Sequence, residues 1–218
     1  MNFVEKIEED IRKRVSKIDE RALVLMDIAK AIMKDDFSHG WPHVLRVTKI
    51  ALKLAEEYEG IDLRALVTAC ILHDIGRSLE QASQEHHAVI SSKFADKILR
   101  IIGYDDEFVE KVKSIILYHS YSLVKKQKVS INYIEAAILS DADKLDALGA
   151  LGIARVLVYG AKINRTLEDS IKHIEEKILK LKDLIITPKA KEIALRRTRI
   201  VQDYIDEIRN ELEELLAI

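Results

Sequence analysis

The stretch LRALVTACILHDIGR, residues 63–77, joins a largely apolar run to a group of polar side chains. Asp62 directly precedes the run and can cap a helix, and the residues from Leu66 to Leu72 are too apolar for a surface element. We therefore expect a helix from Leu63 to about His73 in the centre of the fold. Because neighbours on a helix point about 100° apart, His73 and Asp74 can converge on one ligand only near the helix end, where they lie.

The segments on both sides of this stretch also show helical spacing of apolar residues. The chain has only 7 glycines and 2 prolines among 218 residues, fewer turn residues than a strand-rich fold needs. We expect polar connections at 75–85 and 119–132. The spacing predicts further helices at 3–33 (one long or two short), 42–58, 87–102, 106–118, 133–142, within 148–166, 168–185 and 188–217.

This pattern predicts an all-α protein that forms a single helical bundle domain over residues 1–218. A core at about 36–160 would hold the functional groups, and a C-terminal helical extension at about 161–218 would pack on it. The last helix carries an apolar stripe at Ile193, Ile200, Tyr204, Ile208, Leu212 and Leu215. Packing onto the domain is the expected role of this stripe, and a coiled coil between two copies is the alternative, so both a monomer and a homodimer fit.

Composition excludes several classes of function. The 35 basic and 37 acidic residues nearly cancel, so we expect no tight binding to nucleic acid. Cys70 is the one cysteine and lies in an apolar run, which indicates a core residue and fits a reducing cytoplasm. The first ten residues are acidic and polar, and the sequence has no apolar run of about 18 residues, so we expect a cytoplasmic protein that does not enter a membrane.

Four side chains at junctions of helix and loop are candidate metal ligands: His43, His73, Asp74 and Asp141. Alone, each has an ordinary explanation, such as a hydrogen-bonded core histidine or an aspartate in a turn. Together, two imidazoles and two carboxylates form a mixed nitrogen and oxygen set that leaves two positions of an octahedral site open. Such a site favours Mn, Mg, Co, Ni or Fe over Zn, because catalytic zinc more often takes three protein ligands.

The combination of three motifs resembles the HD phosphohydrolase superfamily. The motifs are SHGWPHVLRV at 38–47, HDIGR at 73–77 and SDADKLDALGALGIARV at 140–156. The resemblance is strongest from about residue 36 to 160, and LKLKDLIITPKAKEIALRR at 179–197 resembles the YedJ-like branch. It implies an all-helical fold around one divalent ion, with the four candidates above as ligands in the family's order, and water activated for attack on a phosphorus–oxygen bond.

The resemblance also implies roles for residues around the ion. We expect Asp74, His87 and His119 to take part in catalysis, with the two histidines acting on substrate phosphate or on a proton. Similar positions hold a second ion in some superfamily members, so a second metal bound by His87 and His119 is the alternative. Three cations are candidate phosphate-binding residues: Arg46, Arg77 and Lys144. His86 is expected to be a bystander.

The expected function is that of a metal-dependent phosphohydrolase acting on a nucleotide or a related small phosphate ester or anhydride. Within this class, the best match is a pyrophosphohydrolase of nucleoside or deoxynucleoside triphosphates. The alternatives are a 5'-nucleotidase-type phosphomonoesterase or a phosphodiesterase. A di-iron oxygenase on the same fold and a non-catalytic nucleotide-binding module are further alternatives.

Overall fold

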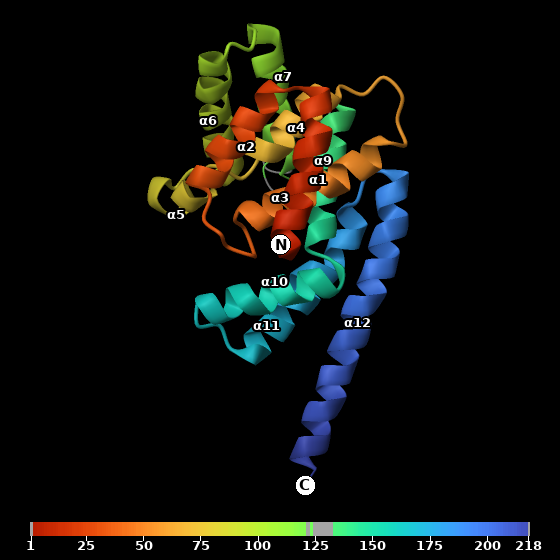
Figure 1. The fold of residues 1–218 in the computed structure, drawn as a ribbon. Helices are drawn as coiled ribbons and strands as arrows, with labels where there is room; N and C mark the ends of the chain where they lie inside the picture. Colours follow the sequence, from red (N-terminus) through yellow and green to blue (C-terminus); the bar gives the residue numbers. More distant parts are fainter. Residues whose placement is uncertain (1, 121–122, 124–132, 218) are drawn as a thin grey trace. The chain divides into compact units, whose positions relative to one another are not determined.

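A computed structural model of the chain describes residues 2–120, 123 and 133–217. Every regular element in these ranges is helical, which confirms the all-α prediction (Figure 1). The connection predicted at 119–132 falls largely outside the described residues. No helix in the described ranges combines the length and the apolar character needed to cross a membrane.

The chain divides into two compact units, residues 1–143 and 144–218. The prediction of one domain with its C-terminal helices packed on the core stays a prediction. The boundary falls within α9 (Ile134–Asp146). The other helices of the first unit are α1 (Phe3–Ile18), α2 (Arg21–Ile32), α3 (Trp41–Ala55), α4 (Leu63–Leu72), η1 (Arg77–Leu79), α5 (Glu80–Ser83), α6 (His87–Ile102) and α7 (Asp106–His119).

Local sequence signals set several helix ends. Asp62 caps α4 by accepting a hydrogen bond from the backbone N–H of Ala65, at 2.9 Å, as the sequence predicts. Asp105 caps α7 in the same way through Phe108. Gly103 ends α6 in the left-handed region, at φ +88°, which glycine adopts without steric cost.

Helix α4 forms the centre of the first unit, which confirms the prediction from its apolar run. All residues from Ala65 to Leu72 are buried, and α4 packs against α2, α3 and α7. Helices α6 and α7 lie side by side, as Figure 1 shows. The C-terminal end of α4 is therefore surrounded by other helices. The polar side chains that follow it, His73 and Asp74, are shielded from water.

The segment after α4 is more ordered than the predicted polar connection. It forms η1 and α5 before α6 begins at His87. Gly76 lets this segment approach α6 closely, because a Cβ there would lie only 2.7 Å from the Ile90 side chain. The backbone N–H of Gly76 also donates to the Ser91 hydroxyl at 3.0 Å.

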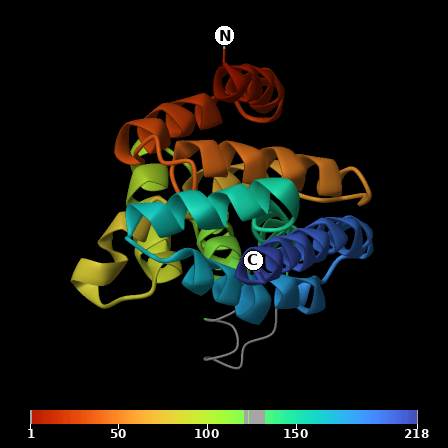
Figure 2. The same cartoon turned by 90° about the horizontal axis from the view of Figure 1, so that it is seen from below.

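The second unit contains α10 (Gly149–Lys162), α11 (Leu167–His173), a π-helical turn η2 (Ile174–Ile178), a 3₁₀ segment η3 (Leu179–Leu184) and α12 (Pro188–Leu216). The single helix predicted at 168–185 is thus three consecutive helical segments. Helix α12 packs against α10 and η3. In the view of Figure 2, α12 is seen nearly end on beside α10.

Candidate metal centre

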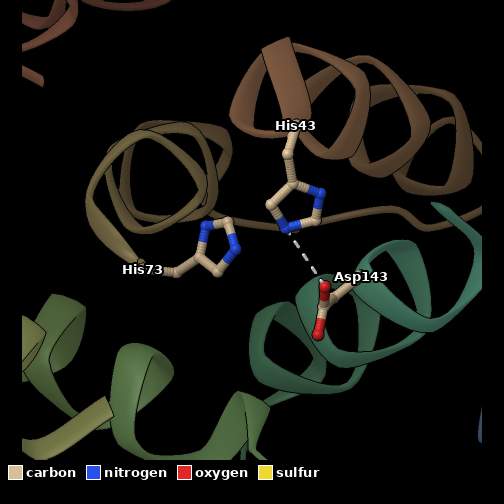
Figure 3. Close-up of side chains that lie close together, drawn as sticks. All are labelled: His43, His73 and Asp143. Atoms are coloured by element: carbon tan, nitrogen blue, oxygen red, sulfur yellow. Dashed lines mark ion pairs between the residues drawn. The ribbon is translucent and has the colours of Figure 1, made fainter. Parts of the chain in front are cut away.

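Three helices bring the central side chains of the site together (Figure 3). His43 lies in the first turns of α3, His73 directly follows α4, and Asp143 lies near the end of α9. The Nε2 atom of His43 is 3.3 Å from Oδ1 of Asp143, and the ring centroids of His43 and His73 are 5.5 Å apart. Both histidines are buried, at 1% and 0% exposure.

The carboxylate that faces His43 belongs to Asp143, whereas the residue predicted from the sequence is Asp141. Residues two apart on a helix point about 200° from each other, so only one of these two aspartates can face α3. Helix α9 is buried on nearly all sides from residue 135 to 142, so apolar periodicity does not indicate which aspartate faces the site. The groups of convergent ligand atoms among the described residues include Asp143 and do not include Asp141, which is fully buried.

His73 is held in an orientation that suits a metal ligand. Its Nδ1 lies 2.8 Å from the carbonyl oxygen of Cys70. Because a carbonyl only accepts, Nδ1 carries the proton and Nε2 keeps its lone pair. This Nε2 is buried and has no hydrogen-bond partner within the described part of the chain. A buried nitrogen without a partner is costly, and a cation in front of it would remove that cost.

His119, the last residue of α7, is arranged in the same way. Its Nδ1 donates to the carbonyl oxygen of Ile116, and its ring stands edge-on to that of His73 with centroids 5.2 Å apart. Burial lowers the pKa of His119 to about 3, and the proximity of His73, which disfavours a second positive charge, adds to this effect. Burial also lowers the pKa of His73. Both imidazoles are therefore neutral near pH 7, the form that binds a metal.

Asp74 lies at the centre of the cluster. Its carboxylate oxygens lie 3.8 Å from Nε2 of His43, 3.9 Å from Nε2 of His73 and 3.6 Å from Nε2 of His87. Nη1 of Arg77 is 3.3 Å from both oxygens. Burial opposes ionisation, but Arg77 and the surrounding histidines outweigh it and hold the pKa of Asp74 far below its usual range.

The donor set fits one divalent cation. Two ligands at right angles around an ion, each at about 2.1 Å, lie about 3 Å apart, and opposite ligands lie about 4.2 Å apart. The distances of 3.3 to 3.9 Å that link His43 to Asp143 and Asp74 to His43 and His73 fall in this interval. Burial opposes ionisation of Asp143, but its hydrogen bond with His43 and the nearby histidines keep its pKa well below the ordinary value. The site thus offers the neutral imidazoles of His73 and His119 and the ionised carboxylates of Asp74 and Asp143.

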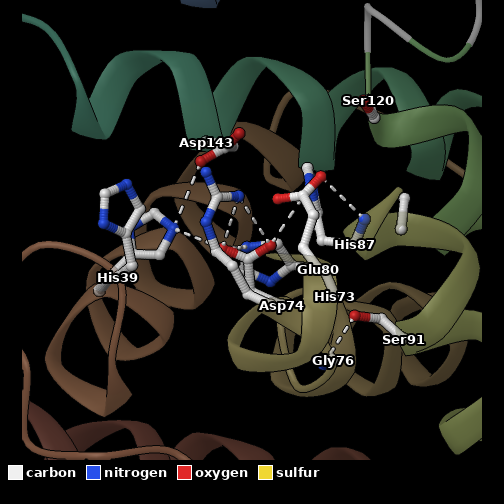
Figure 4. Close-up of polar contacts among 12 residues, drawn as sticks. His39, His73, Asp74, Gly76, Glu80, His87, Ser91, Ser120 and Asp143 are labelled. Carbon is white, nitrogen blue, oxygen red and sulfur yellow. Dashed lines mark hydrogen bonds and ion pairs between the residues drawn. The ribbon is translucent and has the colours of Figure 1, made fainter. Parts of the chain in front are cut away.

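A second group of ligand-type side chains adjoins the first (Figure 4). Oε1 of Glu80 is 3.1 Å from both the backbone nitrogen and Nδ1 of His87. The Nε2 atom of His87 consequently faces Asp74, at 3.6 Å. Ligand atoms of Glu80, His86 and His87 lie within 4.8 Å of one another, as do those of His73, Asp74 and His119.

Two features of this group were not predicted. Glu80 falls in the segment expected to be a polar connection, and only the folding of η1 and α5 brings it to His87. His86, expected to be a bystander, caps α6 by accepting from the backbone N–H of Ala88 at 3.2 Å, and its Nε2 lies 3.3 Å from the Ser120 hydroxyl. No sequence signal pointed to either contact.

The three predicted phosphate-binding cations have different surroundings. Arg77 lies at the cluster, and 34% of its side chain is exposed. Arg46 donates to the carbonyl oxygen of Phe37 at 2.9 Å and stacks over the ring of that residue. Lys144 directly follows Asp143 in α9 and is buried. Arg77 contacts Asp74 through Nη1.

Comparison with known proteins assigns this region to a family. The HD domain family matches residues 40–148, a range that contains His43, His73, Asp74 and Asp143. The Bacillus subtilis protein YpgQ is 30% identical over 188 residues, which cover 84% of this chain and 89% of YpgQ.

Solved structures extend this similarity to the fold. The crystal structure of Bacillus subtilis YpgQ in complex with ADP matches with a TM-score of 0.69 and 26% identity, over 88% of this chain and 95% of that chain. The crystal structure of an HD-superfamily hydrolase from Bacillus thuringiensis matches with a TM-score of 0.68 and 31% identity, over 90% and 98%.

Proposed function

The chain belongs to the HD domain family of metal-dependent hydrolases, and we propose that it is a nucleotide phosphohydrolase. The observation that carries this proposal is the buried cluster of His73, two carboxylates and Arg77. Nε2 of His73 lies near both carboxylates and has no hydrogen-bond partner among the residues that the structure describes. We propose His43, His73, Asp74 and Asp143 as the ligands of one divalent cation. When bound, such a cation lowers the pKa of a water molecule and offsets negative charge on a phosphate oxygen.

The surrounding residues would bind the substrate and move protons. Arg77 has five N–H donors, of which Nη1 lies near Asp74, and its guanidinium is suited to phosphate oxygens. Glu80 fixes His87 through Nδ1, so that Nε2 can accept a proton from an attacking water or return one to a leaving group. His119, Arg46 and Lys144 stay candidates for contacts with the substrate or with the attacking water.

The proposed metal is Mn²⁺, with Mg²⁺, Co²⁺, Ni²⁺ and Fe²⁺ as alternatives. Two carboxylates and two imidazoles suit octahedral ions. Zinc is less favoured, because catalytic zinc more often takes three protein ligands. A second ion near His87 and His119 is the alternative to a proton-transfer role for these residues. The ligand-type groups at His73, Asp74 and His119 and at Glu80, His86 and His87 support that alternative.

The proposed substrate is a nucleoside or deoxynucleoside triphosphate, cut to the monophosphate and pyrophosphate. The complex of the similar protein YpgQ with ADP supports a nucleotide ligand. A 5'-nucleotidase-type phosphomonoesterase or a phosphodiesterase would use the same centre and differs in the product released. The activity is expected of a monomer or a homodimer with no role for nucleic acid or membrane, and a cytoplasmic location is part of the proposal.

The test is a product-resolved screen of ribo- and deoxynucleotides with freshly metallated protein. Mono-, di- and triphosphates are incubated with each of the divalent ions, and pyrophosphate and phosphate are measured separately. We expect pyrophosphate from triphosphates, most rapidly with Mn²⁺, and loss of at least about 100-fold in rate in Asp74→Ala. Phosphate from monophosphates would instead assign the phosphomonoesterase reaction, and absence of both products would contradict the proposal.

Two other readings of the centre have distinct signatures. A di-iron oxygenase, suggested by the additional histidines, requires about two iron ions per chain and oxygen uptake by the reduced protein. A non-catalytic nucleotide-binding module would bind nucleotide without releasing either product. The same metallated samples, analysed for metal content, oxygen uptake and nucleotide binding, distinguish both from a hydrolase.

A further inference from the structure

Helix α12 has two apolar faces, and the second unit covers one of them. The covered face consists of buried residues that pack toward α10 and η3: Ala194, Thr198, Val201 and Ile205. At 100° per residue, a second apolar face lies about 90° around the helix. We call this face the outer stripe, and it consists of Ile193, Ile200, Tyr204, Ile208 and Leu215.

Every member of the outer stripe is at least partly exposed. Ile200 is 43% exposed and Leu215 is 69% exposed, while Ile193, Tyr204 and Ile208 are half-buried. Leu212 is in line with the covered face, beyond its last buried residue, and is 36% exposed, so it is not part of the outer stripe. The last turns of α12 run beyond α10 and α11 (Figure 1). A row of large apolar side chains left partly exposed along one helix face indicates a contact with another molecule.

The spacing of the outer stripe is symmetric about Tyr204. Ile200 and Ile208 lie four residues on either side of it, and Ile193 and Leu215 lie eleven residues on either side. Eleven residues are close to three turns of helix, so the stripe runs almost straight along α12. When two such helices run antiparallel with Tyr204 facing its copy, Ile200 faces Ile208 and Ile193 faces Leu215.

The charge of α12 is polarised along the same axis. Residues 189–199 contain five lysines and arginines and one glutamate, whereas residues 203–214 contain six acidic residues and one arginine. A parallel pair would place the acidic halves against each other. An antiparallel pair places the basic half of each helix along the acidic half of the other, which is favourable at both ends.

We propose that α12 is a dimerisation helix, which pairs with α12 of a second copy of this chain in antiparallel orientation with Tyr204 at the twofold axis. The contact between the residues from Ile193 to Leu215 would be about 33 Å long at 1.5 Å per residue. It is isologous, so each copy contributes the same stripe and no open-ended assembly forms. A contact between two single helices is small, so micromolar affinity is expected.

Sedimentation equilibrium of the full chain, from about 5 to about 200 µM, tests the pairing. We expect a monomer–dimer equilibrium that weakens as salt rises from about 0.05 to about 0.5 M, because opposite charges meet across the contact. Ile208→Glu should weaken association at least about 100-fold, because it places a charge in the contact between the two outer stripes. The matched control is Leu195→Glu, which changes a 58% exposed leucine on the opposite side of α12 and should leave association unchanged.

Far-UV circular dichroism and thermal melting of both variants verify that each chain stays folded. A wild-type chain that stays monomeric at about 200 µM contradicts the proposal. Equal loss of association in both variants also contradicts it, because the contact would then not be specific to the outer stripe.

Disulfide trapping tests the orientation. The natural thiol of Cys70 is fully buried, so any disulfide that forms between two chains is assigned to the introduced surface cysteines. In the antiparallel pair, Ile200→Cys should form a disulfide only when mixed with Ile208→Cys. Each variant alone should stay uncross-linked, because equivalent positions lie about 12 Å apart along the axis, beyond disulfide reach. Cross-linking within either variant alone would indicate a parallel pair and overturn the proposed orientation.

Discussion

A single backbone contact prepares His73 for its role. The carbonyl oxygen of Cys70 accepts a hydrogen bond from the Nδ1–H of His73, so the Nε2 lone pair faces the carboxylates. His119 repeats the arrangement through Ile116. Both carbonyls belong to the helical turn that precedes the histidine, so the orientation of each ring is set locally. The cluster is therefore organised before any ligand binds.

The two aspartates of α9 provide a direct test at this scale. Asp143→Asn keeps the shape of the side chain but removes its charge beside His43, so Mn²⁺ affinity should fall at least about 10-fold. Asp141→Asn is the matched control, because it makes the same chemical change two residues away and should leave the affinity unchanged. Calorimetric titration of metal-free protein with Mn²⁺ measures both. Loss of affinity in Asp141→Asn alone would restore Asp141 as the ligand.

At the scale of elements, the site depends on how closely the end of α4 approaches α6. Gly76 permits that approach, since the atoms nearest to an added Cβ belong to the side chain of Ile90 and the backbone of Ser91, at 2.7 to 2.8 Å. The approach brings His73 and Asp74 toward the segment that carries Glu80 and His87. The close approach between the end of α4 and α6 thus brings the two groups of ligand-type residues together.

Substitution of this glycine should destabilise the protein measurably. Gly76→Ala forces Ile90 or the backbone of α6 to move, which should lower the free energy of unfolding by about 1 to 3 kcal/mol. Gly60→Ala is the control, because Gly60 has φ +69° and no atom within 4 Å of the added Cβ. Gly60→Ala should lower the free energy of unfolding by about 1 kcal/mol, through backbone strain alone. Urea unfolding of both variants makes the comparison, and a cost at Gly76 no larger than that at Gly60 would refute the packing account.

Across the molecule, one buried carboxylate links three helices of the first unit. Glu8 in α1 accepts from the indole N–H of Trp41 in α3 at 3.1 Å and pairs with Lys30 in α2 at 3.0 Å. Arg12 contributes a further contact at 3.2 Å. Burial opposes ionisation of Glu8, but the hydrogen bonds from Trp41, Lys30 and Arg12 outweigh it and lower its pKa.

This network predicts a pH-dependent part of the stability. Because the pKa of Glu8 is lower in the folded chain, its contribution is present above the unfolded pKa and is lost as pH falls through the folded value. Glu8→Gln should therefore reduce the free energy of unfolding by about 1 to 2 kcal/mol at pH 7. The difference should be smaller at pH 3 than at pH 7, because at pH 3 Glu8 is protonated in the unfolded chain, which reduces the stability gained from its lowered folded pKa. Denaturant unfolding at both pH values measures this, and a difference that is independent of pH would contradict it.

Much of the architecture follows from local patterns. Apolar spacing predicted the all-α fold and nearly every helix, and the run from Leu66 to Leu72 predicted a central buried helix. These predictions succeed because helix formation and burial depend on neighbouring residues three or four positions apart. Segments η1 and α5 after Asp74 were not predicted, because their polar sequence has no apolar period.

The sequence by itself determined the helical class, the position of His73 and Asp74 at the end of a buried helix, and the kinds of ligand available for a metal. Only the tertiary structure decided that Asp143 faces His43, that Glu80 orients His87, and that one stripe of α12 stays exposed while another is covered. The physical reason is the same in each case. Which side of a helix faces a partner depends on contacts between segments distant in sequence, and a helix that is buried or apolar on two sides carries no local signal of that choice.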